Sequence, residues 1–197
     1  MMIGDPSIFA IESEMSITYE RLGARALGFF VLYVGGKRYG VRASDATLLA
    51  NAFDSVEERI SDRGKHLVGT LAHRSAFEIA LAYRCEFYGE TQYDFYCELP
   101  AEEFASYFSR REGHITWAPG CDEAFDDSSY VMHFDVDDRI RLIAFKSGDF
   151  NLTGPDSLVE PNSLSEAWLS ADVFYGILQE WHTAFLAEWN ASDKKAT

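Results

Sequence analysis

The stretch between residues 27 and 41 restricts the fold more than any other part of the sequence. Leu27 to Val34 is almost wholly apolar, Gly35-Gly36 follows it at once, and Lys37 to Val41 completes the stretch. Two adjacent glycines adopt positive φ without a Cβ penalty, so they favour a tight turn between two strands. We therefore predict a β-hairpin over Gly28 to Val41, which implies antiparallel pairing.

Further strands are indicated by short runs of β-branched and aromatic residues. Residues 7–13 and 15–20 are extended candidates near the N-terminus, and residues 115–117 form another brief candidate. Residues 130–135 and 140–145 predict a second hairpin joined by a short turn.

Residues 76–88 fit two patterns. Apolar residues occupy every second position from 77 to 87, which is typical of a strand, but every fourth residue from 77 to 85 is also apolar, as in a helix. The alternation is the longer and cleaner pattern, so we predict a strand. A turn at residues 89–91 would then pair it with a second strand over residues 93–99.

Three helices are expected. Ser44 is a suitable cap for a helix that ends near residues 63–64, and Pro100 suits the start of another that ends near residues 110–111. The strongest helical pattern is the last one, with Ser165 or Ser170 as its cap. Its predicted buried stripe consists of Phe174, Ile177, Trp181 and Phe185.

Together these elements predict an α+β fold. We expect a mainly antiparallel sheet with β-hairpins, two or three helices packed on it, and a long C-terminal helix. The length of 197 residues suits one large domain. We assign residues 1–191 to a single α+β domain and residues 192–197 to a frayed tail.

Composition narrows the choice of partner. Thirty-two acidic residues against seventeen Lys and Arg give a formal net charge of −15. This excess disfavours nucleic acid and anionic membranes as direct partners, because both are bound through cationic residues. The longest stretch without a charged residue, Ala26 to Gly36, is eleven residues long, well short of the roughly 20 that a membrane helix needs.

The cysteines and the N-terminus favour a cytoplasmic protein. The first residues have neither the basic nor the apolar region of a signal peptide. Cys85, Cys97 and Cys121 show no C-x-x-C spacing. Free thiols in a reducing cytosol are the simpler interpretation, and one internal disulfide is the alternative.

No familiar catalytic motif occurs. The sequence lacks a Gly-rich phosphate loop, a G-x-S-x-G turn and an H-E-x-x-H motif, so we expect no catalytic residue, cofactor or metal site. His133 and Asp135 share one face of a predicted strand, but a solvated histidine is the commoner outcome of such a pair. Asp135, Asp137 and Asp138 do not complete a calcium loop, because Ile140 stands where that loop needs glycine.

One part of the chain carries charge of a single sign. Glu112 to Asp138 contains eight acids and no Lys or Arg. Such a stretch is either solvated surface or a docking face that attracts a cationic protein, and we predict a docking face. The candidate partner-binding residues are Asp122, Glu123, Asp126, Asp127, Asp135, Asp137 and Asp138.

Several short segments resemble the immunity protein 42 family. They are Gly4 to Glu12, Gly28 to Val34, Gly36 to Gly40, Arg141 to Phe145, and the closing Phe174-Tyr175…Trp189 helix. The resemblance implies a cytoplasmic antidote that binds the C-terminal domain of a polymorphic or contact-dependent growth inhibition toxin, without catalytic residues of its own. A basic, nuclease-type toxin would fit the acidic composition, because a nuclease needs a basic cleft for its substrate.

Two other hypotheses are kept open. An acidic nucleic-acid mimic would inhibit DNA-binding enzymes in general, and it would carry phosphate-like spacing of acids on one continuous surface. A small hydrolase would use His133 and nearby carboxylates in a deep pocket. Stoichiometric binding to one toxin remains the main hypothesis, and the sequence leaves the oligomeric state undetermined.

Overall fold

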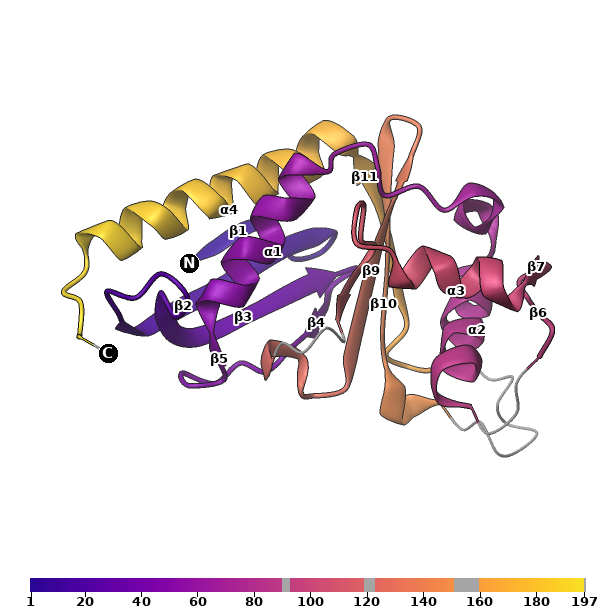
Figure 1. The fold of residues 1–197 in the computed structure, drawn as a ribbon, viewed down its shortest axis with the longest axis horizontal. Helices are drawn as coiled ribbons and strands as arrows, with labels where there is room; N and C mark the ends of the chain where they lie inside the picture. Colours follow the sequence, from indigo (N-terminus) through magenta and orange to yellow (C-terminus); the bar gives the residue numbers. More distant parts are fainter. Residues whose placement is uncertain (90–92, 119–122, 151–159, 197) are drawn as a thin grey trace.

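Antiparallel sheets form the framework of the computed structural model, which describes residues 1–89, 93–118, 123–150 and 160–196 (Figure 1). Among the described residues, the larger sheet has the strand order β1-β2-β3-β4, and β5 also pairs with β3. The smaller sheet has the strand order β11-β10-β9-β8. The strands of these two sheets are β1 (Met2–Asp5), β2 (Phe9–Thr18), β3 (Ala26–Val34), β4 (Lys37–Tyr39), β5 (Thr47–Leu48), β8 (Thr116–Ala118), β9 (Ser129–Val136), β10 (Arg139–Lys146) and β11 (Ser165–Ser170).

Each of the two sheets is covered by its own pair of helices. The long C-terminal helix α4 (Ala171–Ala191) and α1 (Leu49–Ser61) lie side by side over the larger sheet, whereas α2 (Ala76–Tyr88) and α3 (Ala101–Ser109) lie beyond the smaller sheet (Figure 1). The described residues also form three short 3-10 helices: η1 (Gly69–His73), η2 (Glu123–Phe125) and η3 (Ser147–Asp149). The predicted α+β class is confirmed, with the strands divided between separate sheets.

The smaller sheet is the middle layer of the molecule. Val131 and Leu142 pack in the core under α1 and α4, while Met132 and Ile143 pack in a second core under α2 and α3. Successive side chains of a strand point to opposite faces, so both faces of β9 and β10 are buried. This explains why these two strands are nearly continuous apolar runs.

Both predicted hairpins are confirmed. Val34 pairs with Lys37 across Gly35 and Gly36, whose φ angles are 57° and 83°. The second hairpin joins β9 to β10 through Asp137 and Asp138. Asp137 has a φ of 54°, and aspartate tolerates this left-handed conformation better than most residues.

Residues 76–88 form helix α2, so the predicted strand is wrong. The Ser75 hydroxyl accepts a hydrogen bond from the Glu78 N–H, and the Glu78 carboxylate accepts one from the Ser75 N–H. This capping box fixes the start of a helix. The alternation of apolar residues resembles that of a strand because α2 is buried on more than one side. Tyr83, for example, packs on Phe108 of α3 and on Phe145 of the smaller sheet.

The strand predicted over residues 93–99 is also wrong. β6 (Phe95–Tyr96) and β7 (Leu99–Pro100) instead pair with each other in a short ribbon. Cys97 and Glu98 make its turn with φ angles of 51° and 65°. The turn expected at residues 89–91 falls mostly on residues 90–92, which lie outside the described residues.

Helix α1 begins at Leu49, four residues later than predicted. Ser44 does not cap it; the Ser44 carbonyl accepts a hydrogen bond from the Ser16 hydroxyl, 2.5 Å away. Thr47 and Leu48 instead extend the larger sheet as β5. Pairing with β3 therefore delays the start of the helix.

Two further boundaries differ from the sequence analysis. The N-terminal candidates are one strand, β2, with a register shift between Met15 and Ile17, and it pairs with β1, which was not expected. Ser165 begins strand β11, so Ser170 is the cap of α4, and its hydroxyl accepts a hydrogen bond from the Val173 N–H. The α3 start after Pro100 and the buried stripe of α4 are confirmed.

The C-terminal segment is held where a frayed tail was expected. The Lys195 N–H donates to the Thr18 carbonyl at 2.8 Å, and the Glu20 N–H donates to the Lys195 carbonyl at 3.2 Å. The Thr18 hydroxyl donates to the Asp193 carbonyl at 2.7 Å. The end of β2 thus offers backbone groups that bind residues 193–195.

Candidate functional site

The acidic residues predicted as one docking face lie at opposite ends of β9. Glu123, Asp126 and Asp127 precede this strand, whereas Asp137 and Asp138 form the turn that follows it. Seven residue steps from Ser129 to Val136 correspond to about 23 Å. Asp122 lies outside the described residues. The predicted set is therefore not one continuous cluster.

The acidic side chains at the two ends of β9 differ in their exposure and in the basic residues near them. Glu123 and Asp126 are exposed, and neither forms an ion pair within the described part of the chain. Asp127 is half-buried: it pairs with Lys146 at 2.7 Å and accepts a hydrogen bond from the Ser129 N–H. Asp137 and Asp138 are exposed next to the cationic Arg139. Arg139 forms no ion pair with either aspartate in the described chain, and its guanidinium lies over the Trp168 ring, 4.9 Å from the centroid. Each end of β9 therefore carries two exposed acids without an ion pair, and a base directly follows those of the turn in the sequence.

Asp135 is buried and is not available to a partner, which corrects its inclusion in the docking face. Its Oδ2 accepts a hydrogen bond from the His66 N–H at 2.9 Å, and its Oδ1 accepts one from the Tyr175 hydroxyl at 2.9 Å. Burial raises the pKa of Asp135, but hydrogen bonds from His66 and Tyr175 outweigh it and hold this pKa below its ordinary value. Asp135 thus ties the loop after α1 and helix α4 to β9.

His133 is completely buried beside this cluster. Its ring centroid lies 4.2 Å from that of His66, and its Nδ1 accepts a hydrogen bond from Trp117 Nε1 at 3.1 Å. Burial, together with the nearby charges of His66 and Arg59, lowers the pKa of His133 well below its ordinary value. A substrate reaches neither His133 nor Asp135, so the hydrolase hypothesis loses its proposed residues.

His66 and Tyr175 belong to this cluster, although no pattern in the sequence predicted it. They stand 69 and 40 positions away from Asp135. No local pattern joins residues at such separations, so only the packing of the loop and α4 against β9 reveals the cluster.

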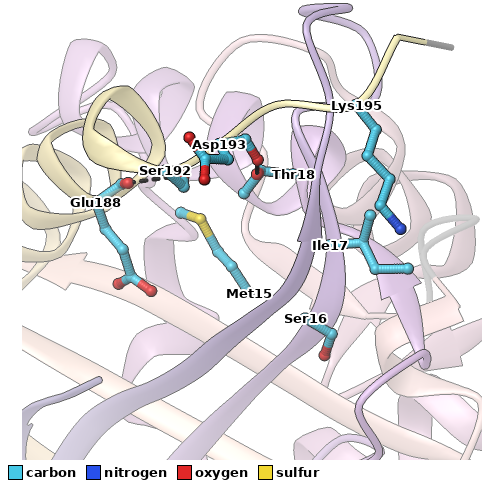
Figure 2. A pocket seen from close by; sticks show the side chains of 8 residues that line it. All are labelled: Met15, Ser16, Ile17, Thr18, Glu188, Ser192, Asp193 and Lys195. Atoms are coloured by element: carbon cyan, nitrogen blue, oxygen red, sulfur yellow. Dashed lines mark hydrogen bonds between the residues drawn. The ribbon is translucent and has the colours of Figure 1, made fainter.

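A small cavity of about 280 Å³ lies between β2 and the C-terminal segment (Figure 2). The hydroxyls of Thr18 and Ser192 point to the carbonyls of Asp193 and Glu188, to which they are hydrogen-bonded. These polar groups hold the C-terminal segment in place. The cavity is therefore the seam at which that segment attaches.

A wider hollow of about 700 Å³ opens between α1 and the segment that follows α3. Lys65 at its margin pairs with both Asp62 and Glu112, and Arg110 donates to the Leu67 carbonyl. The lining residues carry charges of both signs: Glu58, Asp62, Ser109, Arg110, Arg111, Glu112 and His114. This mixture gives the hollow no clear preference for an anion or a cation.

The described residues offer few features of a metal site, a membrane span or a disulfide. Among the described residues, no group of three or more His, Cys, Asp or Glu side chains is placed to hold a metal ion. No helix in that part of the chain combines the length and the hydropathy needed to cross a membrane. Cys85 and Cys97 are free thiols, and Cys121 lies outside the described residues.

Comparison with known families decides between the remaining hypotheses. The model of the family described as immunity protein 42 matches residues 1–184. The chain belongs to the immunity protein 42 family. The resemblance seen in the sequence is thus confirmed, and membership of the immunity protein 42 family places the chain among the toxin-neutralising immunity proteins.

The immunity protein 42 chain also shares its fold with a protein of known structure. The crystal structure of CdiI from Burkholderia dolosa AUO158 matches it with a TM-score of 0.54 and 17% sequence identity. The match covers 93% of this chain and 99% of that chain. A search of curated proteins finds no match.

Proposed function

We propose that this protein binds one cognate toxin domain and neutralises it by stoichiometric occlusion, without turnover of its own. The observation that carries the proposal is the family match over residues 1–184. We further propose that the toxin is a basic, nuclease-type enzyme. The formal net charge of −15 supports a cationic partner, because opposite charges steer two proteins together.

The proposed site of action is the cytoplasm. The free thiols of Cys85 and Cys97 suit a reducing compartment. An antidote in that compartment would meet a toxin domain before the toxin reaches its substrate.

We propose that docking uses the η2 end of β9, through Glu123 and Asp126. These carboxylates are exposed and have no ion-pair partner among the described residues. At the other end, the cationic Arg139 directly follows Asp137 and Asp138 in the sequence and lowers the local net charge. A nucleic-acid mimic would need one continuous acidic surface, and the length of β9 separates these two groups of acids.

A titration of toxin activity tests the mode of action. Purified protein should reduce the activity of the cognate toxin domain to zero near a one-to-one ratio, and co-expression should restore growth. Stoichiometric binding gives this result because each antidote molecule occupies one toxin molecule. Complete protection at strongly substoichiometric amounts would show enzymatic inactivation of the toxin and would overturn the proposal.

Matched charge variants test the docking end. Glu123→Gln with Asp126→Asn removes two negative charges at the η2 end, and Asp137→Asn with Asp138→Asn removes two at the turn. We expect the first pair to slow association with the toxin several-fold at low salt, because steering depends on exposed charge. The second pair should leave the rate nearly unchanged. Equal effects of the two pairs would contradict docking at the η2 end.

A further inference from the structure

Within the described part of the chain, the exposed aromatic side chains lie in one short region. Among the described residues, the exposed rings are Phe87 (39% exposed), Tyr88 (49%), Tyr93 (54%) and Phe95 (64%). We call these four residues the aromatic face. All four lie within nine residues, at the C-terminal end of α2 and around β6. Large exposed rings gathered in one region typically mark a binding surface.

Buried rings hold parts of the aromatic face in place. Phe87 packs against Phe108 of α3, with ring centroids 5.9 Å apart, and Tyr93 packs against Tyr96 at 5.8 Å. Tyr96 in turn contacts Phe104 of α3 at 5.4 Å. Phe87 and Tyr93 are therefore attached to the second core, so that little conformational entropy is lost when a partner binds these two rings.

Tyr88 connects the aromatic face to the η2 end of β9. Its ring packs edge-on against Tyr130, with centroids 5.8 Å apart. Tyr130 lies three residues after Asp127, at the start of β9. The aromatic face thus begins at the same end of the sheet as the exposed Glu123 and Asp126.

Carboxylates accompany the aromatic face without cationic partners. Four acids on α2, α3 and the start of β6 have no ion pair with a Lys or Arg of the described chain: Glu86, Asp94, Glu102 and Glu103. The one base between residues 76 and 109, Arg84, stacks over Tyr88 with its Cζ 4.6 Å from the ring centroid. Aromatic rings and carboxylates without a cationic partner both attract cations, which makes this region suited to cationic side chains.

We propose that the aromatic face binds Lys and Arg side chains on the surface of the toxin domain, through cation–π contacts supported by these carboxylates. The proposal rests on the toxin-binding function proposed above and names the chemistry of the contact. A second copy of this chain is disfavoured as the occupant, because each copy carries a formal charge of −15 and the two acidic surfaces would repel.

Substitution of two exposed rings tests the contact. Tyr93→Ala with Phe95→Ala should accelerate dissociation from the toxin domain by at least about tenfold and weaken protection on co-expression, because aromatic anchors contribute most to such interfaces. The matched control is Leu22→Ala with Leu67→Ala, at side chains that are 60% and 54% exposed but lie elsewhere. We expect the control pair to dissociate at the wild-type rate and both pairs to melt like the wild type. Wild-type dissociation of the Tyr93/Phe95 pair would overturn the proposal.

A second substitution separates cation–π binding from simple apolar contact. Phe95→Leu keeps an apolar side chain but removes the ring, so it should bind as weakly as Phe95→Ala if the ring attracts a cation. Wild-type affinity of Phe95→Leu would refute the cation–π contact.

Two other experimental results would contradict the proposal in different ways. A wild-type protein that neither binds nor protects against its toxin would refute the proposed function, and this inference with it. Sedimentation that shows a wild-type dimer broken by Phe95→Ala would assign the aromatic face to self-association instead of the toxin.

Discussion

At the scale of single residues, Trp181 shows how one side chain joins a helix to the larger sheet. It is fully buried in the stripe of α4, where it packs edge-on against Phe30 of β3. Its indole N–H donates to the Ser13 hydroxyl of β2 at 2.9 Å. The side chain therefore combines a large buried area with a satisfied polar group.

Trp181→Ala should lower the free energy of unfolding by about 3–5 kcal/mol, because it leaves a cavity and an unpaired Ser13 hydroxyl. Val173→Ala on the same helix is the control; Val173 is exposed, so its removal should change the free energy by less than about 0.5 kcal/mol. Urea unfolding followed by circular dichroism measures both. A similar, small effect of the two changes would mean that Trp181 is not a core residue.

At the scale of elements, α2 shows a local signal that outweighs a hydrophobic pattern. The alternation of apolar residues favours a strand, but Ser75 and Glu78 form a capping box that begins a helix. The serine and the glutamate three residues later are visible in the sequence. The alternation of apolar residues arises because α2 contacts both α3 and the smaller sheet. It favoured a strand over the helix that Ser75 and Glu78 indicate.

Ser75→Ala should destabilise the protein by about 1 kcal/mol, because it removes the acceptor for the Glu78 N–H at the start of α2. The matched control is Ser106→Ala within α3, where the exposed hydroxyl bonds the Glu103 carbonyl of its own helix. That bond contributes little to helix stability. Chemical denaturation compares the two variants, and equal midpoints would show that the capping box does not stabilise α2.

At the scale of the whole molecule, two cores meet at the smaller sheet, and a buried polar cluster lies at the C-terminal end of its inner strand β9. Asp135 of β9 bonds the loop that carries His66 and the helix that carries Tyr175, while His133 lies completely buried against His66. The relative positions of the loop, the sheet and α4 thus depend on groups that titrate.

Stability should fall as the pH is lowered from about 7.5 to about 5.5. Burial holds the pKa of His133 well below 6.5, the value expected in the unfolded chain, and burial also lowers the pKa of His114 and His182. Below that pH the unfolded chain binds more protons than the folded chain, so the free energy of unfolding decreases. A urea midpoint that does not change over this range would contradict the prediction.

Two histidine variants test whether His133 causes this pH dependence of stability. His133→Gln should weaken the slope of unfolding free energy against pH, whereas His73→Gln, at an exposed position, should preserve it. Below about pH 4 a further loss is expected, because the hydrogen bonds that lower the pKa of Asp135 depend on its ionised form. Equal slopes for the two variants would show that His133 does not contribute.

The sequence by itself determined the features that depend on neighbouring residues. Gly35-Gly36 specifies the first hairpin because both residues adopt positive φ, and the spacing of Phe174, Ile177, Trp181 and Phe185 specifies the buried face of α4. The acidic excess predicts a cationic partner through charge alone, and this partner is part of the proposed function. These signals act within a few residues, or do not depend on position at all.

The tertiary structure alone decided which distant residues meet. It buried Asp135 against His66 and Tyr175, separated the remaining acids along the length of β9, and exposed the rings from Phe87 to Phe95 beside carboxylates. Each outcome depends on how a strand or helix packs against an element far away in the chain. Such packing reflects the burial of whole faces, which no local spacing in the sequence contains.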